Sequence, residues 1–111
     1  MNLLEKNIDE YIDGLVTQVL SSPAFNMVSL QQQEEMNNKL YNHFYQVILD
    51  TTIDNLNEEQ ISQLEALDPE SPQMEEKISL FAAQIPGLAQ VLEQKLNEEV
   101  AKIKQTGQIP Q

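Results

Sequence analysis

The sequence predicts an all-α fold, a compact bundle of about five helices at approximately 3–21, 30–54, 58–67, 72–85 and 87–105. Three observations support this. Apolar residues recur at three- and four-residue spacing along most of the chain, proline and capping residues separate the periodic segments, and no segment alternates apolar and polar residues as a strand would. Because the connections are short, we expect neighbouring helices to pack antiparallel in one domain, 1–107, followed by a frayed tail, 108–111.

The first predicted helix carries a wide apolar stripe. Nine apolar residues recur at helical spacing: Leu3, Leu4, Ile8, Tyr11, Ile12, Leu15, Val16, Val19 and Leu20. Pro23 ends the helix because proline disfavours the helical region for the residue before it. A stripe of this width exceeds what one packing partner requires, which makes self-association through this helix a hypothesis.

The second predicted helix begins after Ser29, a suitable N-cap. Its apolar positions are Leu30, Met36, Leu40, Tyr41, Phe44, Tyr45, Val47 and Ile48. The polar run 31–35 leaves the first turns hydrophilic on all sides, so we expect them to project into solvent.

Local capping signals place the remaining helices. Asn57 can cap a third helix with Gln60 reaching back to it, which is the pattern of a capping box. Ser71 followed by Pro72 is the N-cap and N1 arrangement of a fourth helix. Pro86-Gly87 then separates this helix from a fifth, which carries both acids and lysines.

Composition excludes several classes of function. The chain has no cysteine, so it has no disulfide, thiolate metal site or cysteine nucleophile. Its 18 acids and 6 basic residues, all of them lysine, give a net charge of -12. Direct nucleic-acid binding and membrane association are therefore not expected, since phosphates would be repelled and arginine is missing. Without a basic start, a signal-like run or a membrane-spanning run, we expect a cytoplasmic protein.

Candidate catalytic and metal-binding residues were weighed against simpler explanations. His43 is the only histidine, and Asp50 two turns later could orient it, but no nucleophile accompanies them. Two carboxylates lie one helical turn apart in two places, at Asp9 and Asp13 and at Asp50 and Asp54. A chain with this many acids contains such pairs by chance. We therefore expect no enzyme, no catalytic or cofactor-binding residue and no metal site, and we rank a metal-dependent enzyme lowest.

Two groups of residues are candidates for partner binding. The first is acidic and falls in 56–85, where seven acids and one lysine give -6: Glu58, Glu59, Glu70, Glu75 and Glu76. The second is the aromatic pair Tyr41 and Tyr45, for which a place in the core is the main alternative. Our first hypothesis is a non-enzymatic module that binds a protein partner or itself. The alternative is a nucleic-acid-mimicking inhibitor whose carboxylates occupy a basic groove on a partner.

The second half of the chain also carries the segments Leu56-Asn57-Glu58-Glu59-Gln60, Leu67-Asp68-Pro69 and Ile85-Pro86-Gly87-Leu88 before an acidic and basic closing helix. In these features it resembles small helical protein families of unknown function from candidate-phyla bacteria. The resemblance implies a stand-alone intracellular helical protein with no assigned activity, and it carries over no functional residues.

Overall fold

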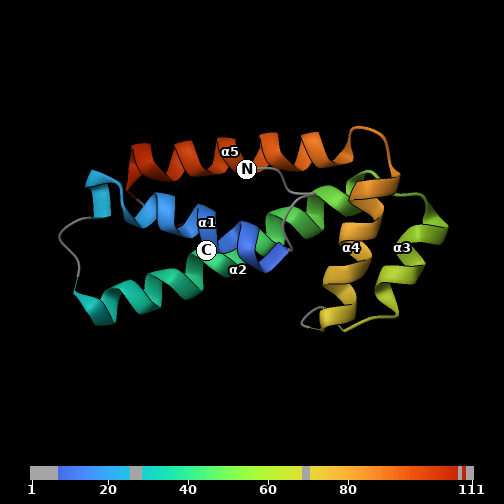
Figure 1. Ribbon diagram of the computed structural model, residues 1–111, viewed down its shortest axis with the longest axis horizontal. Helices are drawn as coiled ribbons and strands as arrows, with labels where there is room; N and C mark the ends of the chain where they lie inside the picture. Colours follow the sequence, from blue (N-terminus) through green and yellow to red (C-terminus); the bar gives the residue numbers. More distant parts are fainter. Residues whose placement is uncertain (1–7, 26–28, 69–70, 108, 110–111) are drawn as a thin grey trace.

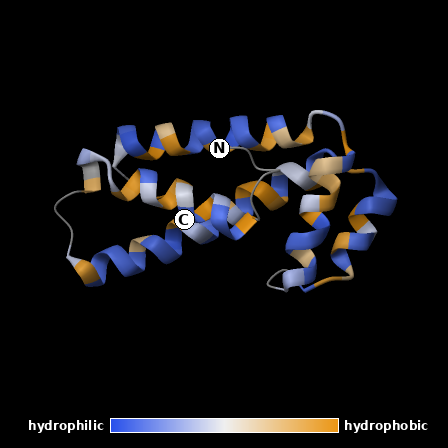
Figure 2. Cartoon of the chain, in the orientation of Figure 1, coloured by the Kyte–Doolittle hydropathy of each residue, from blue (hydrophilic) through white to orange (hydrophobic). Residues whose placement is uncertain are grey.

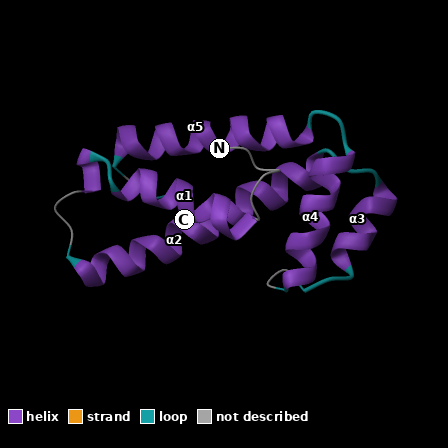
Figure 3. Cartoon of the chain, in the orientation of Figure 1, coloured by secondary structure: helices purple, strands orange, loops and turns teal. Residues whose placement is uncertain are grey.

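The computed structural model describes residues 8–25, 29–68, 71–107 and 109, and these residues confirm the all-α prediction (Figure 3). They form five α-helices, α1 (Ile8–Leu20), α2 (Leu30–Asp54), α3 (Glu58–Glu65), α4 (Pro72–Gln84) and α5 (Leu88–Thr106), and one short 3-10 helix, η1 (Pro23–Phe25). Within this described part there is no strand, and no helix is both long and apolar enough to cross a membrane.

The helices are arranged in two parts (Figure 1). Helices α1, α2 and α5 lie along the long axis, with α2 running antiparallel to the other two, and α1 packs against both of them. The α3–α4 hairpin lies across one end of this three-helix bundle, where α4 contacts α2 and α5. The molecule is therefore elongated, with extents of 46 × 25 × 23 Å.

The apolar stripes face a common interior (Figure 2). Buried residues of α1 are Ile8, Tyr11, Ile12, Leu15, Val16 and Val19. Helix α1 packs against three elements, α2, α5 and η1, and so it needs a wide apolar stripe to contact all of them. This stripe is used inside the chain, so its width no longer argues for self-association; Leu3 and Leu4 lie outside the described residues.

The predicted starts of α2, α3 and α4 are confirmed in detail. Ser29 and Gln32 form a capping box on α2, and Asn57 and Gln60 form a second on α3, with backbone-to-side-chain distances of 2.9–3.2 Å. On α4 the Ser71 Oγ accepts from a backbone N–H in the first turn. These contacts satisfy helix N–H groups that otherwise have no partner, which fixes where each helix begins.

Several details differ from the sequence prediction. The predicted connector contains η1, whose Phe25 is buried, and there the Ser22 hydroxyl donates to the Val19 carbonyl at 2.6 Å. Helix α1 ends at Leu20 rather than 21, and its predicted start at 3 lies outside the described residues. Helix α3 ends at Glu65 rather than 67, and α4 ends at Gln84 rather than 85. Helix α5 spans Leu88–Thr106, one residue later at both ends than predicted. In the tail predicted to fray, Ile109 packs half-buried against the core, while the rest of the tail lies outside the described residues.

Candidate functional site

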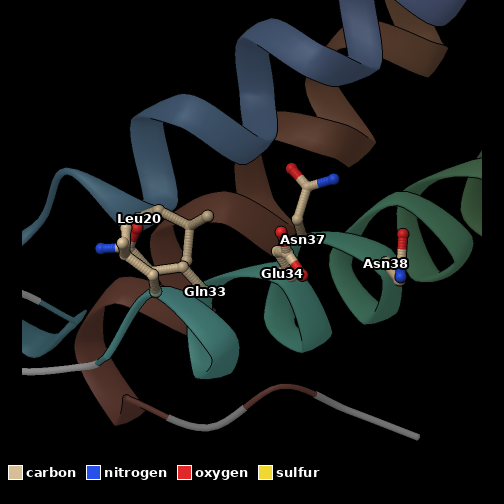
Figure 4. A pocket seen from close by; sticks show the side chains of 6 residues that line it. Leu20, Gln33, Glu34, Asn37 and Asn38 are labelled. Atoms are coloured by element: carbon tan, nitrogen blue, oxygen red, sulfur yellow. The ribbon is translucent and has the colours of Figure 1, made fainter.

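A hollow opens between the end of α1 and the start of α2. Its volume is about 540 Å³, and its lining consists of Leu20, Leu30, Gln33, Glu34, Asn37 and Asn38. Gln33 lies beside Leu20, and Asn37 projects toward α1 (Figure 4). We call this feature the α1–α2 hollow.

The hollow exists because the first turns of α2 extend beyond the packed core. The first buried residue of α2 is Leu40, ten positions after the helix begins, so the predicted projection of this segment into solvent is confirmed. Leu30, the apolar residue at the start of these turns, is 81% exposed, at the rim of the hollow. Single exposed apolar side chains are common on protein surfaces, so Leu30 is a candidate contact residue only because it lies beside a concave surface.

A second cluster joins three helices through one hydroxyl group. Tyr41 of α2 donates a hydrogen bond to the Asp9 carboxylate of α1, and its hydroxyl oxygen lies 3.5 Å from Oε1 of Glu75 in the first turn of α4. Tyr45 stacks on Tyr41, with ring centroids 6.3 Å apart and planes inclined by 14°. We call the three residues that meet at the hydroxyl group the Asp9–Tyr41–Glu75 cluster.

The cluster disfavours further negative charge. Burial, and after it the hydrogen bond and charge of Asp9, raise the pKa of Glu75, although the Tyr41 hydrogen bond lowers it. Burial and the same carboxylates also raise the pKa of Tyr41, and burial with Glu75 and Asp9 raises the pKa of Tyr45 to about 12. Each shift has the same origin, because ionisation would place another anion in a partly dehydrated acidic site.

His43 has a structural role that links two helices. Its Nε2 lies 3.0 Å from Oε2 of Glu99 on α5, and both side chains are about four-fifths buried, with 18% and 20% exposed. Asp50, considered above as its orienting partner, instead accepts a hydrogen bond from Gln46 at 2.8 Å. The hypothesis that pairs His43 with Asp50 is wrong.

The predicted acidic partner-binding residues separate into two environments. Glu58, Glu59 and Glu76 are exposed on the α3–α4 hairpin, at the end of the molecule opposite the hollow. Glu75 instead turns inward to the cluster, and Glu70 lies outside the described residues. Tyr41 and Tyr45 are half-buried, with the Tyr41 hydroxyl engaged by acids of the chain itself.

The two acid pairs considered for metal binding have different neighbours. Asp9 meets Tyr41 and Glu75, and Asp50 accepts from Gln46. All four aspartates are exposed. Among the described residues, no group of three or more His, Cys, Asp or Glu side chains is placed to hold a metal ion.

Comparison with protein-family models, with curated proteins and with solved structures finds no match to this chain. The resemblance to helical families of unknown function therefore stays a prediction. The α1–α2 hollow, the Asp9–Tyr41–Glu75 cluster and the exposed acids of the α3–α4 hairpin are the candidate sites of this chain.

Proposed function

We propose that this chain is a non-enzymatic, cytoplasmic protein-interaction module that binds its partner, another protein or a second copy, through the α1–α2 hollow. The observation that carries the proposal is the 81% exposure of Leu30 beside a hollow of about 540 Å³. For scale, a cavity of roughly 150 Å³ holds a benzene molecule, so the hollow has room for more than one partner side chain.

The chemistry of the lining suits a polar rim around a small apolar contact. Leu20 and Leu30 supply the apolar surface, and amide and carboxylate side chains surround them. Interfaces commonly combine an apolar centre with a polar rim that forms hydrogen bonds. Burying Leu30 fully would contribute about 1.5–3 kcal/mol, which is enough to act as an anchor for a partner of moderate affinity.

The test is site-specific photo-crosslinking in cells. A photoreactive amino acid replaces Glu34, which is exposed in the lining of the hollow one turn after Leu30, in one variant and the exposed Gln94 of α5 in a matched control. We expect one dominant adduct at position 34 and not at position 94, and its mass distinguishes a second copy from another protein. Equal labelling at both positions, or no adduct at position 34, would refute the proposal.

A second candidate function, a nucleic-acid-mimicking inhibitor, is supported by the exposed carboxylates of the hairpin. Glu58, Glu59 and Glu76 give it a strongly negative end. It predicts that the protein displaces DNA from a basic probe, purified histone, and that higher salt weakens this displacement.

The test of this second function replaces Glu58, Glu59 and Glu76 by lysine. The control has the same net charge, because lysines replace three exposed acids elsewhere: Glu34, Glu35 and Glu98. If only the Glu58, Glu59 and Glu76 variant fails to displace DNA from histone, the result supports the nucleic-acid mimic. If both variants lose the same amount of displacement, the effect depends on net charge alone and the second function is refuted.

A further inference from the structure

The Asp9–Tyr41–Glu75 cluster contains more acceptors than hydrogen-bond donors. A tyrosine hydroxyl carries one proton, and Tyr41 donates it to Asp9. Glu75, whose Oε1 lies 3.5 Å from the same hydroxyl oxygen, therefore cannot receive that proton as well. A second proton, on one of the two carboxyl groups, would complete the cluster.

Within the part of the chain that the structure describes, the groups that face this cluster from each of its helices are acids and phenols. Asp9 and Asp13 face it from α1, Tyr41 and Tyr45 from α2, and Glu75 from α4. Among these described residues, the neighbouring charges that act on Tyr41 are all negative. A proton is thus the simplest cation that can neutralise this contact between three helices.

We propose that Asp9, Tyr41 and Glu75 form a proton-dependent latch between the start of α4 and helices α1 and α2. With one proton held between the two carboxyl groups, the latch is closed, because the Tyr41–Asp9 contact and the Asp9–Glu75 contact then each have a hydrogen between their oxygens. When that proton is lost, two carboxylates repel each other across the contact, and the first turn of α4 separates from α1.

The direction of the pH effect follows from the shift on Glu75. Its pKa in the folded chain lies above the ordinary 4.5, so between these values the folded state holds more protons than the unfolded state. The free energy of unfolding then falls as pH rises through this window. The latch contributes fully below pH 4.5 and is lost above the raised pKa.

The experiment compares wild type with Glu75→Gln and with the control Glu76→Gln. Glutamine is neutral and can donate to Asp9, so Glu75→Gln keeps the latch closed at every pH, whereas Glu76 is exposed on the same helix. The measured quantity is the rate of amide hydrogen exchange in the first turns of α4. At each pH the wild-type rate is divided by the rate of the variant, because this ratio removes the pH dependence of chemical exchange itself. We expect this ratio for Glu75→Gln to be unity below pH 4.5 and to rise several-fold toward neutral pH.

A carboxyl-carbon NMR titration of Glu75 provides a second readout that a purely structural role would not affect. We expect its midpoint above 4.5 in wild type and a return toward 4.5 in Asp9→Asn, because the facing charge is removed. The latch is refuted if the Glu75 midpoint is ordinary, if Asp9→Asn leaves it unchanged, or if the exchange ratios for Glu75→Gln and Glu76→Gln show the same pH dependence.

Discussion

Helix α3 is held to the molecule by very little apolar surface, and this leads to a quantitative prediction. It spans Glu58–Glu65, 8 residues, and Leu64 is its only buried residue. Isolated helices shorter than about 12–15 residues are marginal in water, so α3 depends on its capping box and on apolar contacts. Burial of the Leu64 side chain contributes about 1.5–3 kcal/mol, and the half-buried Leu56 and Leu67 that flank the helix pack against the core and add to this.

Leu64→Ala should therefore cost about 2–3 kcal/mol, the low end for a buried leucine, because an edge helix can adjust to the lost volume. We expect only part of this cost in the global free energy of unfolding. Once α3 detaches, the form without it becomes the ground state, and helices α1, α2 and α5 no longer sense the substitution.

Hydrogen exchange measured together with urea unfolding separates these effects. In wild type, α3 amides should exchange faster than those of α5, and in Leu64→Ala they should lose nearly all protection while α5 remains protected. Leu64→Met, which conserves volume, serves as the control and should cost less than about 1.5 kcal/mol. If α3 and α5 lose protection by the same factor and the global free energy falls by the full 2–3 kcal/mol, α3 is not a separate unit and the reasoning fails.

Three further predictions follow from named contacts. The pKa values of Tyr11 and Tyr41 are raised and that of Tyr45 is raised to about 12, so absorbance at pH 10.0 should show less phenolate in the folded chain than in the chain unfolded by urea; equal phenolate in both states would contradict this. His43→Ala should lower the free energy of unfolding in urea by about 1–2 kcal/mol through its lost 3.0 Å contact with α5, and an unchanged midpoint would exclude that role. Asn57→Ala should cost about 1 kcal/mol, with faster exchange confined to α3; a change spread over α5 would argue against a local cap.

Helix boundaries could be predicted because the signals that set them are local. Ser29, Asn57 and Ser71 lie within three residues of the N–H groups that they cap, so the sequence alone shows both partners. The late start of the buried stripe on α2 was also predictable, because a polar run is visible without knowing what it faces. These features depend on the chain's own neighbours and not on its tertiary packing.

The residues of the candidate sites could not be predicted in the same way. Tyr41 is 32 positions from Asp9 and 34 from Glu75, and His43 is 56 positions from Glu99. No periodicity within one helix indicates which side chains of another helix will face it. In the sequence Glu75 is therefore indistinguishable from its exposed neighbour Glu76, and only the packing of α4 against α2 separates them.

Leu30 shows a further limit of the sequence pattern. It is an apolar residue in helical turns that were expected to project into solvent, and the sequence does not show that it lies beside a hollow. Leu20, the last residue of α1, lines the same hollow, so α1 reaches this height, but the start of α2 lies apart from it (Figure 1). An apolar residue marks a face that can be buried, and the distance to the partner helix decides whether it is.

The two candidate functions use opposite ends of the molecule and can therefore be separated. Leu30 and the acidic hairpin lie toward different ends of a chain 46 Å long, whereas charges in physiological salt are screened over about 8 Å. Leu30→Ser should abolish hollow-dependent crosslinking from a neighbouring α2 position and leave histone competition intact, and lysines at Glu58, Glu59 and Glu76 should do the reverse. Combining both sets should give additive losses, because the sites share no contact. If either set alone removed both activities, a single partner would have to span both ends, and the functions would not be independent.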